Sequence, residues 1–355
     1  MILLFLLAFV LVFVIAAFYG LQQFLVYDQD GVSLQFRRTE TSGPAESAQP
    51  TAVPTPDVSG MQVNIVFTDP SFDDIALPVG EGLQPLRARQ IGFADVLDSA
   101  KLAAGISAAA EAGCGAVVLE MKTAAGQLAW RSAAEMAVSF GTIGAADFSE
   151  TLASLHEKGL YAVAKVSVCA DDLMAVRNWP IALRGADGQP YQDADGHFWL
   201  DPYNRDVRSY IIPLLQELSA MGFDEILLTD LMHPAAEAEF QYSVTLRSDP
   251  SPRAAVCQLA RKLAEAMRDS GTKLSVQIGE AALETETAAR SGQDLTVFWK
   301  LFDRVVCPCT AGQAESVCTS ALAFGGSRER FVPLCQWAAP EGWDGSYIYS
   351  VPAEN

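Results

Sequence analysis

Several carboxylate residues stand at or just beyond the ends of apolar segments of this chain, and Glu120, Asp171 and Asp230 are among them. Two carboxyl groups that face one cleft can hydrolyse a glycosidic bond, one as the acid and the other as the base or nucleophile. Their separation is about 5–5.5 Å when configuration is retained and roughly 6.5–9.5 Å when it is inverted. These residues are therefore the candidate catalytic groups, provided that the fold brings their side chains to one cleft.

Two lysines are expected close to Glu120. Lys122 lies two residues further along the same segment, where the side chains of a strand return to the same face, and Lys165 lies in the next apolar segment. An unpaired charge inside an apolar strand is costly, so Glu120 needs a partner. Either the lysines bind a ligand together with Glu120, or a Glu–Lys ion pair only closes the interior, and the sequence leaves both open.

Three further side chains are candidate substrate-binding groups. Trp199 offers an aromatic face on which a sugar ring could stack, His233 is the one histidine expected near the active face, and Gln336 ends a late apolar segment. Trp179 and Trp337 could extend such a surface. The alternative is that these aromatic side chains simply cover the mouth of the fold.

Eight short apolar segments alternate along the chain with segments of helical periodicity. The apolar segments are Val63–Thr68, Ala116–Met121, Tyr161–Val168, Glu225–Leu228, Leu274–Ile278, Arg304–Cys307, Phe331–Leu334 and Tyr347–Tyr349. The helical segments include Phe93–Ala112, Ser149–Lys158, Asp206–Met221 and Pro252–Ser270. Runs this short, and mostly without alternation, are typical of strands buried on both faces. The pattern predicts an α/β fold, a (β/α)8 TIM barrel of parallel strands, whose active site lies at the C-terminal strand ends.

The end of the fourth predicted strand poses a problem for Asp230. Side chains alternate along a strand, so the inward position there belongs to Thr229, which cannot act as the acid or the nucleophile. Asp230 would then point away, unless the strand has already ended or contains a bulge. Both arrangements of Asp230 remain open.

Several motifs resemble a known family. The chain reads LHEKGLY at 155–161, WLDP at 199–202 and GFDEI at 222–226. These motifs resemble a bacterial family of glycoside hydrolase-like TIM-barrel domains, whose patterns read LHEKGIY, WLDP and GFDEIQFDYVRFP. VVLEMKTAAG at 117–126 and FVPLCQ at 331–336 are similar to further family strands. The resemblance spans most of residues 61–350 and implies a barrel that acts on glycans.

The departures from the family pattern fall on the presumed catalytic positions. Thr229 stands where the family has the Asp of QFDY, and Asp230 occupies the Tyr position. Glu120 replaces another family Asp, and Lys165 replaces an Arg, which keeps the charge and loses the two-pronged guanidinium. Asp171 matches the Asp that closes a family strand.

The N-terminal region predicts a membrane anchor followed by a stalk. Residues 1–27 contain no charged side chain and exceed the roughly 20 residues that span a bilayer. A cleaved signal peptide is the alternative. Residues 28–60 read as a flexible stalk rich in Pro, Ser and Thr, and residues 61–355 as the barrel. Arg37 and Arg38 favour an external N-terminus, whereas a short N-terminal tail and a large C-terminal domain favour an extracellular barrel. We expect the barrel to be extracellular.

Charge and cysteine spacing narrow the class of partner. A formal net charge of −19 argues against nucleic acid. The Cys307–Cys309 spacing is not that of a zinc knuckle or a thioredoxin-like site, and no Gly-rich phosphate loop is visible, so neither a metal nor a cofactor is predicted. One disulfide among Cys307, Cys309, Cys318 and Cys335 remains open in an oxidising location.

Two functional hypotheses follow. The first is a membrane-anchored, extracellular glycoside hydrolase acting on cell-wall or extracellular polysaccharide. The second is a catalytically degenerate barrel that binds glycan, or holds a surface complex together, without turnover. A fold alone does not decide function, so the two hypotheses are weighed by their residues. Glu120 and Asp171 favour the first hypothesis, and Thr229 favours the second.

Overall fold

The computed structural model describes four stretches of the chain and two short strands near its N-terminus. The stretches are residues 70–234, 236–243, 251–284 and 290–351, and the strands are β1 (Leu25–Asp28) and β2 (Gly31–Leu34). The chain divides into two compact units, Met1–Ile65 and Val66–Asn355. In the first unit β1 and β2 form an antiparallel pair.

The predicted anchor (1–27) and stalk (28–60) fall mostly outside the described residues. The pair of strands β1 and β2 spans the boundary between them. None of the helices in the described part of the chain is both long and apolar enough to cross a bilayer.

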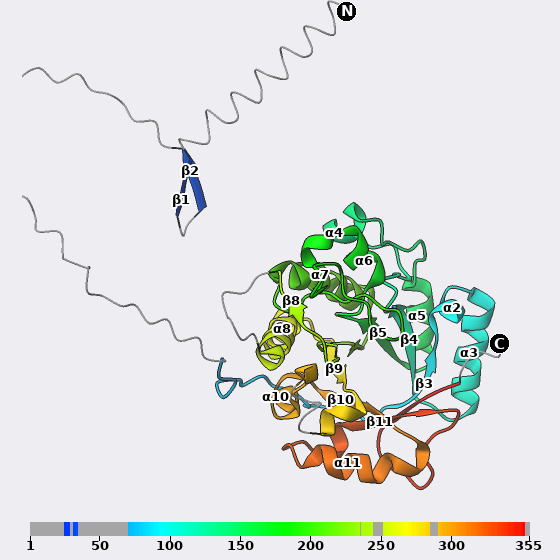
Figure 1. The fold of residues 1–355 in the computed structure, drawn as a ribbon. Coiled ribbons are helices and arrows are strands. Elements are labelled where there is room, and N and C mark those ends of the chain that lie inside the picture. The colour runs from blue at the N-terminus through cyan, green and yellow to red at the C-terminus, as the bar shows by residue number, and fades with distance from the viewer. Residues whose placement is uncertain are drawn as a thin grey trace, which may run out of the picture. The chain divides into compact units, whose positions relative to one another are not determined.

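The second unit is a closed barrel of eight parallel strands, as the sequence predicts. The strands are β3 (Arg87–Ile91), β4 (Ala116–Lys122), β5 (Tyr161–Ser167), β7 (Glu225–Thr229), β9 (Lys273–Gln277), β10 (Arg304–Pro308), β11 (Phe331–Gln336) and β12 (Tyr347–Ser350). Their order around the ring is β10-β11-β12-β3-β4-β5-β7-β9, and β9 pairs with β10 to close it. In Figure 1 the strands surround the centre and the helices lie outside them.

The first barrel strand differs from the prediction. The position between β12 and β4 is taken by Arg87–Ile91, whereas the predicted segment, Val63–Thr68, lies outside the described residues. The sequence RARQI is too polar to stand out as a buried strand, and only Ala88 and Ile91 are buried. A strand that ends at the barrel mouth needs no apolar side chain at that end, and β3 therefore lacks the apolar run that marks the other strands.

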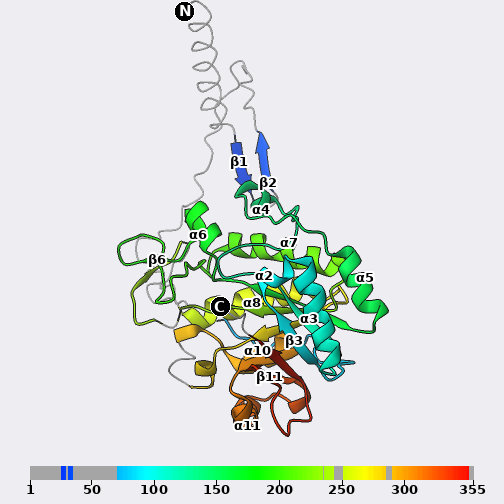
Figure 2. The same cartoon turned by 90° about the vertical axis from the view of Figure 1, so that its right-hand side faces the viewer.

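Helices occupy the connections between the strands. They are α2 (Phe93–Val96), α3 (Ser99–Glu111), α4 (Glu135–Ser139), α5 (Ser149–Glu157), α6 (Asp172–Arg177), α7 (Arg205–Met221), α8 (Pro252–Met267), α10 (Leu295–Leu301) and α11 (Ala314–Leu322). Short 3-10 turns are η1 (Trp179–Ile181), η2 (Glu280–Leu283), η3 (Ala311–Gln313) and η4 (Arg328–Arg330). Figure 2 shows α3 and α5 on the outside of the barrel.

The helix predicted over Phe93–Ala112 is divided into α2 and α3. Asp98 interrupts it with an extended backbone, and its carboxylate accepts hydrogen bonds from the backbone N–H groups of Ala100 and Lys101. An aspartate at this position satisfies N–H groups that a new helix leaves without partners, so it starts a helix rather than continuing one.

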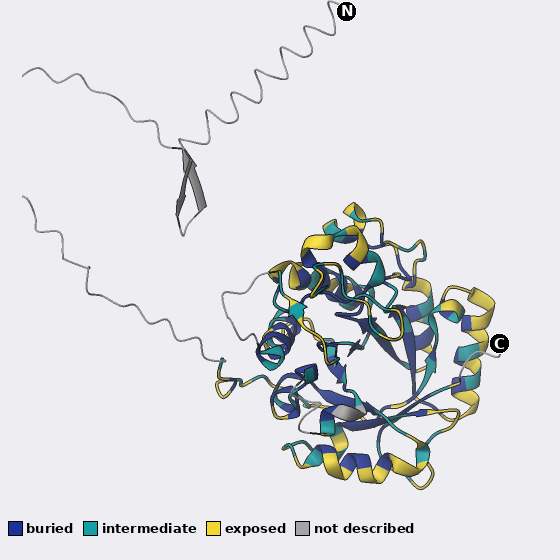
Figure 3. Cartoon of the chain, in the orientation of Figure 1, coloured by how far each residue is buried: buried dark blue, intermediate teal, exposed yellow. Residues whose placement is uncertain are grey.

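Apolar side chains form two layers on either side of the barrel wall. The inner layer fills the barrel and includes Ala88, Val118, Val163, Leu227, Val306, Val332 and Ile348. The outer layer packs between the strands and the helices, and it includes Val117, Leu119, Ala164 and Leu228. Figure 3 shows the strands buried and the outer faces of the helices exposed. Because the two layers alternate along a regularly paired strand, its residues can be assigned to the barrel interior or to the helix side.

An ion pair closes the N-terminal end of the barrel interior. Arg304 donates to Glu225, which also accepts hydrogen bonds from Ser275 and from the Tyr161 hydroxyl. Burial raises the pKa of Glu225, while the charge of Arg304 lowers it. Glu225, at the start of its strand, therefore has a structural role.

Candidate active site at the barrel mouth

Polar side chains replace the apolar inner layer at the C-terminal end of the barrel. On β3, β4, β5 and β7 the residue two places after an inner-layer residue is polar. On β9 the interior position that pairs with Val306 is Gln277, and on β11 Gln336 lies two residues after the inward-facing Leu334. This mouth ring consists of Gln90, Glu120, Lys165, Thr229, Gln277 and Gln336. Carbohydrates are bound through such amide, hydroxyl and charged groups, and barrel enzymes carry their active sites at this end.

Glu120 is held at the mouth by two contacts. One carboxylate oxygen accepts a hydrogen bond from Lys165 Nζ at 2.9 Å, and the other accepts one from the backbone N–H of Phe93 at 3.1 Å. The side chains of Glu120 and Lys165 are 21% and 18% exposed. The expected Glu–Lys ion pair therefore exists, and it lies where solvent or a ligand can reach it.

Lys122, the other expected partner of Glu120, lies on the opposite side of the barrel wall. Glu120 pairs in register with Lys165, but Lys122 pairs with the very next residue, Val166, because β4 bulges at Met121. An extra residue in a strand reverses the side on which later side chains lie. The prediction that Lys122 faces the substrate with Glu120 is wrong.

Asp171 joins Lys122 in a buried cluster behind the barrel wall. Its carboxylate accepts hydrogen bonds from the Met174 N–H at 2.8 Å and the Tyr210 hydroxyl at 3.1 Å, and its distance to Lys122 Nζ is 2.8 Å. Asp171 and Lys122 are both 0% exposed. Asp171 is thus the N-cap of α6 and half of a buried ion pair, so the structure gives it a structural place rather than the predicted catalytic one.

Asp230 reaches the mouth through an unusual backbone. It follows the last residue of β7 with φ of 53°, in the left-handed region that side chains other than glycine rarely adopt. The Thr229 hydroxyl, which belongs to the mouth ring, donates to the Asp230 carboxylate at 2.9 Å. The strand has therefore ended before Asp230, and the two side chains meet instead of pointing to opposite faces. No ion pair involves Asp230 within the described residues.

Trp199 and His233 do not line the mouth, contrary to the prediction. Trp199 is 6% exposed and its indole N–H donates to Asp193 at 2.8 Å, so its ring belongs to the core. His233 is 2% exposed, packs edge-on against Phe240, and its Nε2 lies 3.2 Å from the Tyr242 hydroxyl. Burial lowers the pKa of His233 to about 4, so its ring is neutral at pH 7. Both residues support the loops around the mouth.

The end of β11 presents Gln336 and Trp337 to solvent. Gln336 is exposed at its predicted position, and Trp337 is 63% exposed with φ of 72°. The Trp337 N–H donates to the Ser350 carbonyl at 2.7 Å, which ties this turn to β12. Within the described residues, Asp230 and Trp337 are the two residues other than glycine with positive φ, and each directly follows a barrel strand at the mouth.

The sequence did not single out Gln90 and Gln277. The side-chain oxygen of each is buried and accepts no hydrogen bond in the described structure. A buried acceptor without a donor is unfavourable, and a ligand hydroxyl would satisfy it. Their only signal in the sequence is their spacing of two residues from inward-facing neighbours such as Ala88 and Ser275, which requires knowing the strands first.

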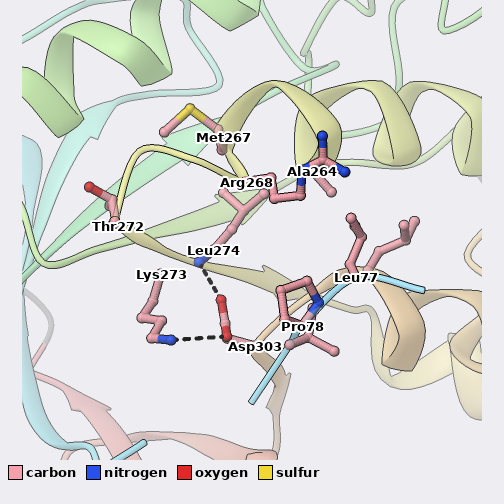
Figure 4. A pocket seen from close by; sticks show the side chains of 12 residues that line it. Leu77, Pro78, Ala264, Met267, Arg268, Thr272, Lys273, Leu274 and Asp303 are labelled. Atoms are coloured by element: carbon pink, nitrogen blue, oxygen red, sulfur yellow. Dashed lines mark hydrogen bonds and ion pairs between the residues drawn. The ribbon is translucent and has the colours of Figure 1, made fainter. Parts of the chain in front are cut away.

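Two cavities lie at the other end of the barrel. A cavity of about 100 Å³ adjoins the start of β9, where Asp303 accepts a hydrogen bond from the Leu274 N–H at 2.9 Å and lies 3.7 Å from Lys273 (Figure 4). A larger cavity of about 570 Å³ is lined by Tyr161 and Arg304. Because Lys273, Tyr161 and Arg304 are the first residues of their strands, both cavities lie away from the mouth.

The residues at the mouth offer no set of metal ligands. Within the described ranges, no three His, Cys, Asp or Glu side chains are grouped to hold an ion. The chemistry that the mouth can supply comes from Glu120 and Asp230 as carboxylates, Lys165 as a cation, and the amide groups.

The chain belongs to the family described as "Putative glycosyl hydrolase domain", whose model matches residues 91–310. This match covers β4, β5 and β7, and therefore Glu120, Lys165 and Asp230. It agrees with the resemblance inferred from the motifs at 155–161, 199–202 and 222–226. No curated protein is significantly similar to the chain.

Two solved structures are similar to the chain at low sequence identity. The glycoside hydrolase domain of PgaB (BpsB) from Bordetella bronchiseptica is 14% identical with a TM-score of 0.52, over 75% of this chain and 94% of that one. A hypothetical protein from Ruminiclostridium thermocellum is 20% identical with a TM-score of 0.46, over 53% of this chain and 95% of that one. The first similarity supports the barrel fold and leaves the chemistry to the residues at the mouth.

Proposed function

We propose that the barrel mouth binds a polysaccharide and hydrolyses its glycosidic bonds, with Glu120 and Asp230 as the two carboxylates. The observation that carries this proposal is the mouth ring, which gathers polar side chains directly beyond the apolar inner layer of the barrel. Both carboxylates lie there, and the family of glycosyl hydrolase domains supports the same reaction class.

The contacts of the two carboxylates suggest different roles. Glu120 is paired with the ammonium of Lys165, and a carboxylate that carries its charge suits a base or nucleophile. Asp230 has no cationic partner in the described structure, and we assign it the role of the acid that delivers a proton to the leaving group. In this assignment Thr229 occupies the position of the family Asp and positions Asp230, and Asp230 supplies the carboxylate.

The ring order favours inversion of configuration. β5 lies between β4 and β7, and neighbouring strands are spaced by about 4.8 Å, so the backbones that carry Glu120 and Asp230 are on the order of 10 Å apart. This spacing is compatible with the roughly 6.5–9.5 Å carboxyl separation of inverting enzymes rather than the about 5–5.5 Å of retaining ones. A water molecule would then attack the sugar from the side of Glu120.

The test is turnover by the full-length chain on peptidoglycan, chitosan and a soluble β-glucan. Release of reducing ends is measured for the unchanged chain, Glu120→Gln and Asp230→Asn. Each variant should lose turnover by about 10²-fold or more, the scale of one lost acid–base group. Asp269→Asn is the matched control, because Asp269 is 91% exposed and follows α8, away from the mouth. Unchanged turnover in both variants would contradict the assignment.

The alternative is glycan binding without turnover. The ion pair of Glu120 with Lys165 and the presence of Thr229 where the family has Asp favour it. Pull-down on the same polysaccharides separates the two functions. Retained binding with no released reducing ends, in the unchanged chain, would support the binding module against the hydrolase.

We also propose that residues 1–27 anchor the protein in the cell membrane as a single span, with residues 28–60 as a stalk and the barrel on the extracellular side. The support is the uncharged apolar sequence of residues 2–27 and the Pro-, Ser- and Thr-rich composition that follows. Such a tether would keep the barrel mouth close to cell-wall polysaccharide.

A further inference from the structure

Two cysteines stand opposite each other at the C-terminal ends of β10 and β11. Pro308 pairs in register with Leu334, so the next residues, Cys309 and Cys335, are also opposite each other. The Cys309 N–H donates to the Leu334 carbonyl at 3.0 Å, which continues the parallel pairing beyond β10. Neighbouring strands are about 4.8 Å apart, within the roughly 4.4–6.8 Å between Cα atoms of disulfide-bonded cysteines.

The two side chains lie on the same side of the barrel wall. Cys307, two residues before Cys309, belongs to the outer apolar layer, and Cys309 packs against that layer. Leu334 packs against the inner layer, so the following residue, Cys335, faces outward as well. Figure 1 shows β10 and β11 side by side, with α11 next to them.

The thiols are already in contact. Cys335 hydrogen-bonds with the Cys309 sulfur, and this contact lowers the pKa of Cys335 although burial raises it. Cys335 is buried, whereas Cys309 is partly exposed. One thiol of the pair is therefore accessible to a small reagent, and the other is activated beside it.

The remaining cysteines differ in environment. Burial raises the pKa of Cys169 and of Cys257 to about 12, so neither thiol ionises readily near neutral pH. The pKa values of Cys114 and Cys318 are raised by burial too. In contrast to these four cysteines, Cys335 has a lowered pKa, and the cause is its hydrogen bond with the Cys309 side chain.

We infer that Cys309 and Cys335 form a reversible disulfide on the rim of the barrel. The oxidant is a small disulfide, written RSSR. The Cys309 thiolate attacks one sulfur of RSSR, the R–S–S–R bond breaks, and RSH leaves with the proton. The Cys335 thiolate then attacks Cys309 Sγ, forms the Cys309–Cys335 bond and releases the second RSH. Two protein thiols and RSSR become one protein disulfide and two RSH, so the exchange is balanced.

The bond would tie the mouth to two loops. Gln336 of the mouth ring and the exposed Trp337 directly follow Cys335, and Thr310, the N-cap residue of η3, directly follows Cys309. A covalent link would hold the end of β11 against β10 and limit the positions open to Gln336 and Trp337. The disulfide does not depend on the proposed function, whereas any effect on glycan binding does.

The test counts thiols in the full-length chain after oxidation. The reduced protein is incubated with oxidised glutathione, denatured, alkylated and weighed by mass spectrometry. We expect two fewer alkylated cysteines than the seven of the reduced chain, and digestion should give a linked pair of peptides containing Cys309 and Cys335. Seven alkylated cysteines after oxidation, or a link between other cysteines, would overturn the inference.

Variants separate this bond from other disulfides. Cys309→Ser and Cys335→Ser should each abolish the internal link, whereas Cys318→Ser, a buried cysteine on the neighbouring α11, should retain it. Should a variant fail to fold, peptide mapping of the unchanged chain still decides the question. A normal link with no glycan binding in any redox state would overturn the proposed function and leave the disulfide intact.

Discussion

Glu120 and Lys122 are two residues apart on one strand, yet their side chains lie on opposite sides of the barrel wall. The bulge at Met121 separates them: Glu120 pairs with Lys165 at the mouth, and Lys122 pairs with Asp171 behind the wall. A bulge next to a site commonly re-aims a side chain. Here it keeps one charged pair accessible and removes the other from solvent.

Asp230 combines its proposed catalytic role with an unfavourable backbone conformation. A left-handed conformation costs roughly 1–2 kcal/mol for a residue with a Cβ and almost nothing for glycine. We therefore expect Asp230→Ala to be less stable than Asp230→Gly by about 1 kcal/mol in urea unfolding, while both lose turnover. Equal stabilities would mean that the protein in solution does not hold the positive φ at this position.

His233 should make stability depend on pH. Its pKa is about 4 in the folded protein against about 6.5 in the unfolded chain, so below pH 6.5 the unfolded state binds more protons and stability falls as pH falls. These values predict a loss of about 2 kcal/mol between pH 7.5 and pH 5. In urea unfolding at both pH values, His233→Asn should remove about this much of the pH dependence. An unchanged dependence would mean that other groups cause it.

At the scale of elements, a buried charged cluster joins α6 and α7 to β4. Asp171 caps α6, Tyr210 belongs to α7, and Lys122 belongs to β4. Gly126 permits the close approach, because a Cβ there would lie 2.1 Å from an Asp171 carboxylate oxygen and its φ is 82°. The cluster therefore positions the loop after β4 relative to two helices.

Removal of one charge from this cluster should be costly. Asp171→Ala leaves Lys122 buried without its ion-pair partner, and breaking such a pair costs about 3–5 kcal/mol. Urea unfolding of Asp171→Ala, Lys122→Met and the double variant measures the coupling, and the double variant should cost clearly less than the sum. Asp98→Ala, an exposed N-cap of α3, is the control and should cost about 1 kcal/mol. Additive losses would mean that the two charges act independently.

At the scale of the whole molecule, the N-terminal unit and the barrel are expected to have separate tasks. Deletion of residues 1–27 should move the protein from the membrane fraction to the soluble fraction, because it removes the uncharged apolar sequence. Turnover or glycan binding per molecule should stay the same. Immunoblots of both fractions measure the change, and a truncated chain that stays in the membrane fraction would contradict the anchor.

Seven of the eight barrel strands could be predicted from apolar segments, and the first could not. Seven predicted segments overlap β4, β5, β7, β9, β10, β11 and β12, whose residues are buried on both faces. The polar strand β3 was not predicted, because Gln90 faces the mouth and Arg87 is exposed. The same cause hid Gln90 and Gln277 from the candidate site, since a polar strand end looks like a loop until its neighbours are known.

The sequence alone determined that the chain forms a closed barrel and that polar groups lie at the C-terminal ends of its strands. The reason is that strand burial and strand–helix alternation depend on the order of apolar and polar residues within short segments. Only the tertiary structure decided which charged groups reach the mouth. Glu120 and Lys165 remain there, Asp230 is brought there by its backbone, and Lys122 and Asp171 are withdrawn. The reason is that a bulge and the end of a strand arise from pairing between distant segments, and a shift of one residue reverses the side on which a charge lies.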